Sequence, residues 1–153
     1  MEKVEEKILN QIIADIAQLK TNVQQIHWYM RGKEFFELHP LMDTYSEQLN
    51  DQLDNVAERL IAIGGSPLST THEFIENTKI PDEKITWNTY SLVDLMDKLS
   101  SYFKTLRDDY TEAIQITDKI NDLPTQDMIN GCKMQIEKNI WMVNAFLNKN
   151  ADQ

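Results

Sequence analysis

Residues 35–65 read FFELHPLMDTYSEQLNDQLDNVAERLIAIGG, and this stretch decides the predicted fold. Its apolar residues share one stripe of a helix, because their spacing suits 3.6 residues per turn. Pro40 is expected in the first turn, where a missing N–H costs little. The run GGSP at 64–67 is the strongest helix breaker in the sequence. We therefore predict a long helix over 35–63, with a core stripe of Leu38, Met42, Leu49, Leu53, Val56 and Leu60.

Three further segments carry the same helical period. Residues 5–31 form the first, which ends at Gly32 in the C-cap role. A third long helix opens at Ser91 and closes near Asn121, and the fourth starts at Pro124. The sequence thus predicts four long helices.

The segment between the second and third helices is mixed in pattern. Thr70 and Glu73 have the spacing of a capping box, which predicts a short helix over 72–76. The stretch near Pro81 and Trp87 is expected to be loop.

The lengths of the connections predict the topology. The two short connections make helices one and two, and helices three and four, antiparallel neighbours. The middle connection, of about 25 residues, is long enough to cross the full height of the bundle. One long crossover in a four-helix protein is the ferritin-like arrangement. We predict an all-α, single ferritin-like domain over 1–153, a four-helix bundle whose crossover between helices two and three carries a short extra helix.

Composition narrows the classes of function. With 153 residues and 41% hydrophobic content, the chain can bury a core, and its few glycines and prolines favour helices. No apolar run reaches the roughly 18 residues that span a bilayer, and the charged segment 1–6 is unlike a signal peptide. The single cysteine, Cys132, favours a reducing, cytoplasmic location. The net charge of −10 disfavours nucleic acid and suits cations, although solubility alone explains an acidic surface.

The long second helix has a second face that carries ligand-type side chains. With about 100° per residue, three of them lie roughly 40° to 100° from His39, whereas the core stripe lies at roughly 260° to 320°. The four residues on this face are His39, Asp43, Asp54 and Glu58. His39 and Asp43 are one turn apart, as are Asp54 and Glu58, so each pair can converge on one cation. His27 is expected to fold back toward the first pair.

The ligand types and their separation predict a shared metal site. Imidazole and carboxylate without thiolate suit iron, zinc or manganese. Asp43 and Asp54 are roughly 16 Å apart along the helix, too far for one metal centre within one chain. Two copies of this helix crossing antiparallel about a two-fold axis would bring Asp54 and Glu58 of one subunit to the first group of the other. An isologous interface of this kind creates two equivalent sites.

The sequence offers no Glu-x-x-His site of the larger ferritin-like proteins. The residues three positions before its histidines are Gln24, Phe36 and Ser69. A site within the bundle core is therefore not expected.

The ligand-bearing region resembles the Dps family (DNA-binding proteins from starved cells, or mini-ferritins). The resemblance is carried by His27-Trp28, Gly32, Phe35-Phe36, His39, Asp43, Asp54, Ala57-Glu58-Arg59 and Gly64-Gly65. It implies a dodecameric shell with a ferroxidase centre between subunits. In that centre His27, His39 and Asp43 come from one subunit, and Asp54 and Glu58 come from its two-fold mate. It also implies Fe(II) oxidation, preferentially with hydrogen peroxide, and storage of the ferric product inside the shell; zinc or another divalent ion is an alternative occupant.

Tryptophans and acidic residues outside the ligand set are assigned further expected roles. Trp28 is a candidate radical sink, whereas simple packing is preferred for Trp141. The resemblance makes Asp118 and Asp127 candidate pore residues, because related cages line three-fold pores with acids. Asp122 is explained as well by a solvated turn.

Three more side chains are expected to be structural. His72 has no ligand partner at helical spacing and is expected at the surface or in local packing. Cys132 is expected to be a buried, inert thiol. Arg59 is expected to pair with an interface carboxylate.

Two rival functions remain at this point. One is a nucleoid-associated, DNA-protecting protein with a minor iron role; it is disfavoured because Lys3 and Lys7 stand among glutamates rather than in a basic tail. We expect weak or absent DNA binding. The other is a structural or adhesive bundle, which would have no use for His27 and His39 beside the acidic face.

Overall fold

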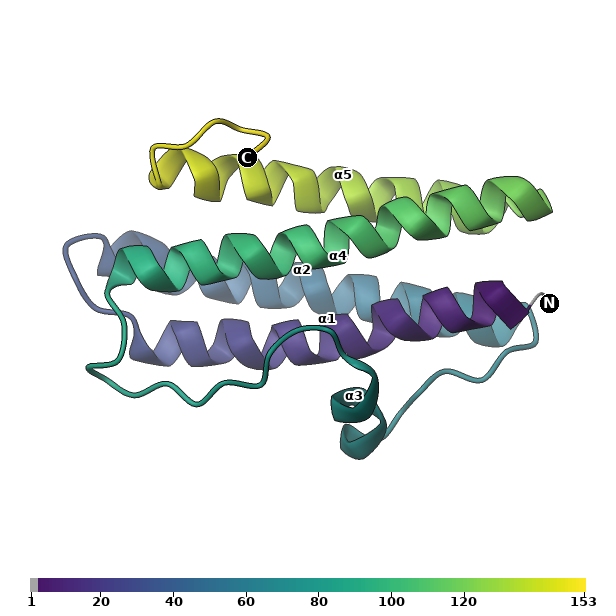
Figure 1. Ribbon diagram of the computed structural model, residues 1–153, viewed down its shortest axis with the longest axis horizontal. Helices are drawn as coiled ribbons and strands as arrows, with labels where there is room; N and C mark the ends of the chain where they lie inside the picture. The colour runs from purple at the N-terminus through teal and green to yellow at the C-terminus, as the bar shows by residue number, and fades with distance from the viewer. Residues whose placement is uncertain (1–2) are drawn as a thin grey trace.

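Among residues 3–153, four long helices lie side by side along the length of the molecule, and a short helix stands beside them (Figure 1). The computed structural model describes residues 3–153, and within them there is no β-strand. Met1 and Glu2 lie outside the described residues. They belong to the charged segment 1–6, on which the exclusion of a signal peptide partly depends. In chain order the helices are α1 (Lys3–Tyr29), α2 (Phe35–Ala62), α3 (Thr71–Asn77), α4 (Leu92–Ile120) and α5 (Leu123–Phe146).

The predicted helices are confirmed, and local chemistry explains where they end. The predicted capping box forms, with Thr70 accepting from the Glu73 amide, and a second box forms where the third long helix was expected to open, with Ser91 Oγ accepting from the Asp94 amide. α1 ends at Tyr29, so Gly32 lies in the turn after the helix and not at its C-cap as expected; its φ of +135° would strain any side chain there.

Pro40 lies deeper in α2 than the sequence analysis placed it. Because α2 begins at Phe35, Pro40 falls in the second turn rather than the first. Its missing N–H leaves the carbonyl of Phe36 without the amide that would normally bond to it. The expectation of a first-turn proline was wrong by about one turn, because a helix that already begins at Phe35 has completed its first turn before Pro40.

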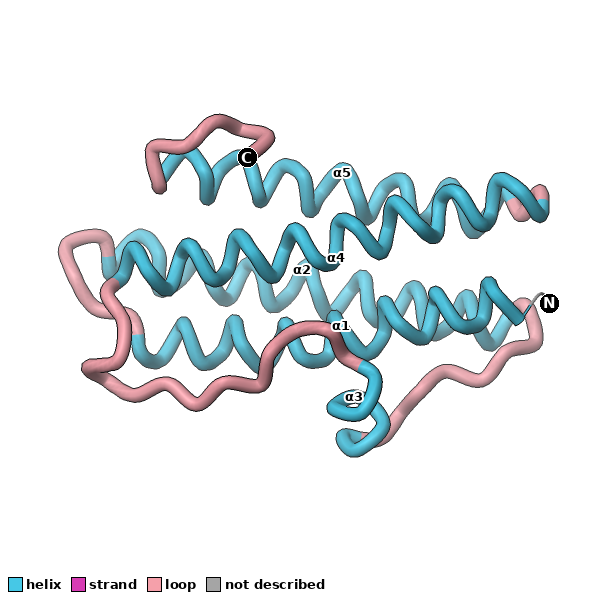
Figure 2. The backbone as a smooth tube through the Cα atoms, viewed as in Figure 1, coloured by secondary structure: helices cyan, strands magenta, loops and turns pink. Residues whose placement is uncertain are grey.

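The packing of the helices confirms the predicted topology. α1 packs against α2, and α4 packs against α5, each as an antiparallel neighbour. α1 also contacts α4, and this contact closes the bundle. Figure 2 shows the crossover running from the end of α2 past α3 and along α1 to the start of α4. Within residues 3–153, no helix is both long and apolar enough to cross a lipid bilayer.

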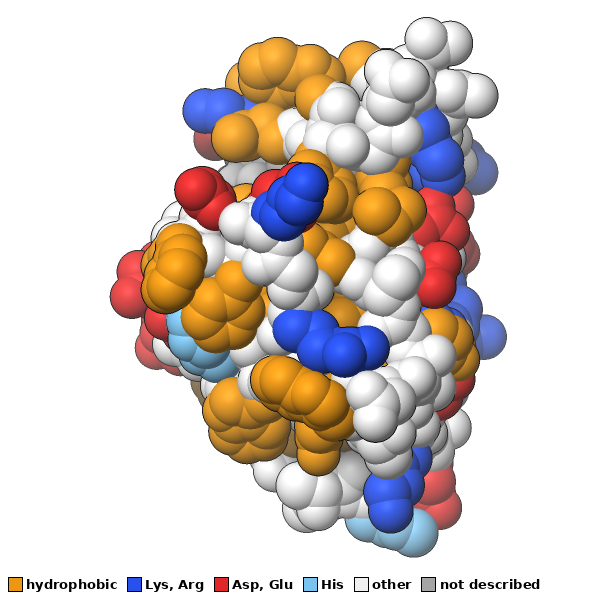
Figure 3. All heavy atoms as spheres, turned by 90° about the vertical axis from the view of Figure 1, so that its left-hand side faces the viewer, with side chains coloured by type: hydrophobic (Ala, Val, Ile, Leu, Met, Phe, Trp, Pro, Cys, Tyr) orange, Lys and Arg blue, Asp and Glu red, His pale blue; other side chains and the backbone are white. Residues whose placement is uncertain are grey.

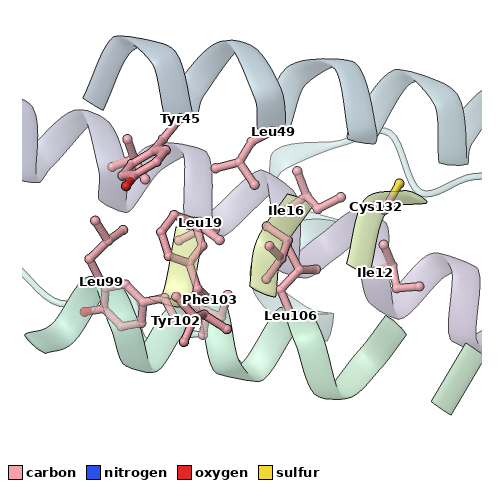
Figure 4. Close-up of a cluster of buried hydrophobic side chains, with 14 of the residues drawn as sticks. Ile12, Ile16, Leu19, Tyr45, Leu49, Leu99, Tyr102, Phe103, Leu106 and Cys132 are labelled. Carbon is pink, nitrogen blue, oxygen red and sulfur yellow. The ribbon is translucent and has the colours of Figure 1, made fainter. Parts of the chain in front are cut away.

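The core is filled by the predicted stripes and by aromatic rings between them (Figure 4). On α2, Leu53 is only partly buried, whereas Tyr45 is fully buried although it was absent from the predicted stripe. The ring of Tyr45 meets the ring of Phe103 edge to face, with centroids 5.1 Å apart.

A buried polar chain joins α2, α4 and α5. The hydroxyl of Tyr110 donates to Gln52 Oε1 at 2.5 Å, and Gln52 Nε2 donates to Gln135 Oε1 at 2.6 Å. Because these two hydrogen bonds pair the hydroxyl of Tyr110 and both polar atoms of Gln52, the chain fixes the three helices relative to one another without leaving those atoms unpaired.

The crossover is tied to α1 by hydrogen bonds from one helix face. Asp15 accepts from the hydroxyl of Thr78 at 2.7 Å and from the amide of Lys79 at 2.6 Å. Further along, Asn22 donates to the carbonyl of Pro81 at 2.9 Å, and Gln25 donates to that of Glu83 at 2.8 Å. These bonds satisfy the backbone of a segment that has no regular structure of its own.

Two fully buried carboxyl groups meet where the crossover touches α4. Asp15 and Asp109 are both inaccessible to solvent, and Lys79 is the cation that pairs with Asp109. Burial, and then the neighbouring Asp15, raises the pKa of Asp109 to about 8, which Lys79 offsets only in part. The pair therefore holds a proton at neutral pH.

The substitution Asp109→Asn is expected to flatten the pH dependence of the free energy of unfolding. Because the pKa of Asp109 is raised from 3.8 to about 8 on folding, its stabilising contribution is full below about pH 4 and is lost as pH rises through about 8. Asparagine stays neutral throughout, so the variant should gain stability over wild type as pH rises from about 4 to about 8, by roughly 3–6 kcal/mol, because each pKa unit of the shift is worth about 1.4 kcal/mol. Urea unfolding at a fixed protein concentration measures this.

The neighbouring Asp108→Asn is the control for that experiment, because its carboxylate is exposed and pairs only with Arg107 at the surface. The free energy of unfolding of Asp108→Asn should depend on pH in the same way as that of wild type. Parallel pH profiles for wild type and Asp109→Asn would show that the buried pair holds no extra proton.

Candidate metal centre

The turn between α1 and α2 brings together the first three predicted ligands. The imidazole rings of His27 and His39 lie parallel, with centroids 3.7 Å apart and planes 11° from each other. His27 Nε2 lies 3.7 Å from Asp43 Oδ1, and the carboxylate of Asp43 is exposed. The fold thus gathers two imidazoles and one carboxylate at one edge of the hairpin.

Reciprocal hydrogen bonds fix the two histidines to each other's backbone. His27 Nδ1 donates to the carbonyl of His39 at 2.7 Å, and His39 Nδ1 donates to the carbonyl of His27 at 2.8 Å. A carbonyl oxygen only accepts hydrogen bonds, so each Nδ1 must carry the proton. In a neutral imidazole this leaves the lone pair on Nε2, which is the atom that can bind a metal.

The sequence explains why this arrangement forms at the hairpin. The carbonyl of His27 lies in the last turn of α1, where no amide four residues on remains in the helix. The ring of His39 supplies the missing donor. His39 and Asp43 are one turn apart on α2, so they project from the same side.

Asp54 and Glu58 lie on the same helix as His39 but nearer its other end. Both side chains are exposed on α2. Among residues 3–153, no three His, Cys, Asp or Glu side chains converge closely enough to hold a metal ion. A single copy therefore presents two separate partial ligand sets, one of His27, His39 and Asp43 and one of Asp54 and Glu58.

Exposed hydrophobic side chains surround the histidine pair. Figure 3 views the end of the molecule that carries the α1–α2 turn, and it shows imidazole atoms at the surface beside hydrophobic side chains, with carboxylates next to them. Phe36 is 85% exposed and Trp28 is 64% exposed. Trp141 is also half-exposed, so the packing expected for it is not found within one chain.

The acidic residues at the α4–α5 turn divide into two kinds. Asp118 and Asp127 are exposed, and Leu123 between them is exposed as well. The side chain of Asp122 is only 17% exposed, and it caps α5 by accepting from the Thr125 amide. The solvated turn left open as one explanation of Asp122 is not found, because this residue serves as the N-cap of a helix.

Asp122 also pairs with Arg59, which corrects the expected partner of that arginine. Arg59 Nη2 lies 3.0 Å from Asp122 Oδ1, so the pair is made within one chain rather than across an interface. Buried Glu5 joins the group: burial and its hydrogen bond with Asp122 raise the pKa of Glu5 to about 7. Burial opposes ionisation of Asp122, but hydrogen bonds from Thr125, Glu5 and Arg59 outweigh it and lower its pKa to about 2.

Sequence reasoning missed this cluster, although one indication was present. Asp122 stands three residues before Thr125 and two before Pro124, which is the pattern of a capped helix start. Glu5 carried no such indication, because its burial depends on where α1 meets α5.

His72 and Cys132 lie apart from these clusters. His72 is exposed, as expected, but its Nε2 lies 2.9 Å from Glu76 Oε1, so it does have a partner at helical spacing. Cys132 is buried, and burial raises the pKa of its thiol to about 11, which agrees with an inert cysteine.

This chain is similar to known ferritin-like proteins in sequence and in structure. Residues 6–151 match the Ferritin family, described as the ferritin-like domain. The DNA protection during starvation protein of Listeria monocytogenes is 43% identical over 143 residues, which cover 94% of this chain and 91% of that protein. The X-ray structure of Dps from Listeria monocytogenes has a TM-score of 0.94 at 42% identity and covers 97% of this chain and 96% of that chain. The structure of Dps from Listeria innocua soaked with zinc has a TM-score of 0.93 at 41% identity, and the match covers 97% of this chain and 99% of that chain.

Asp122 should stabilise the fold in two ways, as a helix cap and as a charge, and two substitutions can separate these contributions. Asp122→Ala removes both the cap of α5 and the ion pair with Arg59, and we expect a loss of roughly 2–3 kcal/mol in the free energy of unfolding. Asp122→Asn keeps a capping oxygen but loses the charge, so it should cost about half as much. Chemical denaturation measures both, and Asp127→Ala, which removes an exposed acid from the same turn, should stay within about 0.5 kcal/mol of wild type. Equal losses for Asp122→Ala and Asp127→Ala would refute the capping role.

Proposed function

This chain belongs to the Dps family of ferritin-like proteins, and from that premise we propose that it oxidises Fe(II) and stores the ferric product inside a dodecameric shell. In this way it would protect the cell against oxidative damage. The observation that carries the proposal is the reciprocal His27–His39 pair, in which both Nδ1 atoms donate to backbone and each Nε2 is left to bind metal; His27 Nε2 lies 3.7 Å from Asp43 Oδ1. A face that served only solvation would not need two imidazoles held in one tautomer.

The separation of the two ligand sets supports assembly as part of the function. Asp54 and Glu58 are exposed and lie roughly 16 Å or more along α2 from Asp43. We place Asp54 and Glu58 of one subunit against His27, His39 and Asp43 of its two-fold mate. The isologous contact then completes two equivalent centres in each pair of subunits.

The donor set suits the chemistry of iron oxidation. Neutral imidazoles hold Fe(II), and carboxylates stabilise the higher charge that develops as the metal is oxidised. Two Fe(II) ions, one hydrogen peroxide and two protons would yield two Fe(III) ions and two waters, so the peroxide bond is broken by two electrons together. We propose peroxide as the preferred oxidant because this route releases no hydroxyl radical.

The same ligands can hold other divalent ions. Imidazole and carboxylate also suit zinc, and Dps from Listeria innocua has been soaked with zinc and with cobalt. We propose that such ions occupy the centre in competition with Fe(II).

Exposed residues supply two auxiliary roles in the proposal. Trp28 follows His27 directly and is largely exposed, so it can donate an electron to a stray oxidant. Asp118 and Asp127 are exposed near the α4–α5 turn, where their charges would attract cations toward a pore. The exposed Leu123 beside them weakens that field.

The buried cysteine and the charge balance suit a cytoplasmic protein that handles cations rather than DNA. Cys132 is the only cysteine and is inaccessible, as expected in a reducing compartment. The net charge of −10 opposes the phosphate backbone of DNA. The nucleoid-associated alternative therefore has no supporting feature among residues 3–153.

Loss of a carboxylate from the partner's ligand set should slow iron oxidation. Asp54→Ala and Glu58→Ala should each lower the initial rate of peroxide-driven Fe(II) oxidation by roughly 10-fold or more, because each removes a ligand that the other subunit cannot replace. The ferric absorption band follows the reaction. Asp108→Ala removes an exposed carboxylate from α4 and should keep the wild-type rate.

The assembly state is the control for the ferroxidase experiment. Size-exclusion chromatography with light scattering should give wild type and variants a mass near twelve times 17.9 kDa. Wild-type rates in Asp54→Ala and Glu58→Ala would remove the catalytic assignment, and a stable monomer would remove the shared centre.

DNA binding is expected to be weak or absent at physiological salt. In a gel-shift assay with linear duplex DNA in magnesium-free buffer, the assembled protein should leave the DNA unshifted, because a net charge of −10 per chain opposes the phosphate backbone. A tight complex that dissociates as salt is raised would favour the nucleoid-associated alternative instead.

A further inference from the structure

Three aromatic rings are stacked in a row at the start of α2. The phenyl ring of Phe35 lies against the imidazole of His39, with centroids 4.6 Å apart and planes 21° from each other. The other face of His39 lies against His27, with centroids 3.7 Å apart. His39 is therefore covered on both faces, by a histidine on one side and by a phenyl ring on the other.

The stack adds a restraint that the hydrogen bonds do not provide. The bond from His39 Nδ1 to the carbonyl of His27 fixes one edge of the imidazole. A single bond at one edge still allows the ring to tilt about that contact. Rings packed on both faces oppose the tilt, so the direction of the Nε2 lone pair becomes fixed as well.

Phe35 is well placed to act as a rigid wall. It is the first residue of α2 and stands one helical turn before His39, so the two side chains project from the same side. Its ring is half-buried and packs against the hydrophobic core, which restrains it in turn. The adjacent Phe36 is 85% exposed and meets Phe35 edge to face at 5.6 Å.

We infer that Phe35 is a positioning residue of the metal centre, which holds the imidazole of His39, and through it that of His27, in the orientation that binds metal. The inference rests on the proposed function for the identity of the centre, whereas the ring stack is independent of it. Phe35 contacts neither metal nor oxidant; it acts by removing the freedom of the ligand. Ligands held in place by neighbouring groups bind metal more tightly, because less entropy is lost on binding.

Co(II) binding by the assembled, iron-free protein tests the inference without any oxidation step. Phe35→Leu keeps an apolar side chain but removes the flat ring, and it should raise the Kd for Co(II) by roughly 10-fold and change the intensity of the cobalt d–d absorption bands. Phe35→Tyr restores a ring and should return both to near wild-type values. Phe74→Leu removes a similarly half-buried phenyl that packs on the core from α3, so it controls for lost packing and should leave Co(II) binding unchanged.

Crystal structures of the metal-free wild type and Phe35→Leu separate this inference from the proposed function. The ring of His39 should be tilted or present in more than one orientation in Phe35→Leu, and single in wild type. If wild type bound no Co(II), the proposed centre would fail, and the ring orientations would decide the positioning role alone. A His39 ring that keeps its place in Phe35→Leu, with Co(II) bound as tightly as by wild type, would overturn the inference.

Discussion

The reciprocal hydrogen bonds between His27 and His39 link the fold of the α1–α2 hairpin to the proposed metal centre. Each ring donates to the other residue's carbonyl, so one contact closes the hairpin of α1 and α2 and also fixes both tautomers. The last turn of α1 would otherwise end with an unpaired carbonyl. The same hydrogen bonds therefore stabilise the fold and orient the imidazoles of the proposed metal centre.

The rigidity of α2 sets the second constraint. Its buried face fills the bundle core with Leu49, Val56 and Leu60, and its opposite face carries carboxylates that a straight helix keeps far apart. A helix cannot bend to bring Asp54 to Asp43. Any centre that uses both must draw on two copies of the chain, and this requirement makes assembly and metal chemistry a single proposal.

Buried charge is handled in the same way at two separate places. Asp15 with Asp109, and Glu5 with Asp122, are carboxyl pairs in which burial and the neighbouring acid raise one pKa, while a single cation contacts the pair. Each pair joins α1 to a distant element: the crossover and α4 in one case, and the start of α5 in the other. In a chain with a net charge of −10, shared protons allow acids to be buried where cations are few.

The sequence by itself determined the helices, their order and the grouping of ligand-type residues on one face of α2, because the helical period and capping chemistry are local properties. It did not place Pro40 in the second turn, bury Tyr45 and Gln52, or pair Arg59 with Asp122, since each of these depends on which elements meet. The stack of Phe35, His39 and His27 was likewise settled only by the tertiary structure. Spacing along a chain fixes which side of a helix a residue occupies, but the approach of a second helix fixes the atoms that it touches.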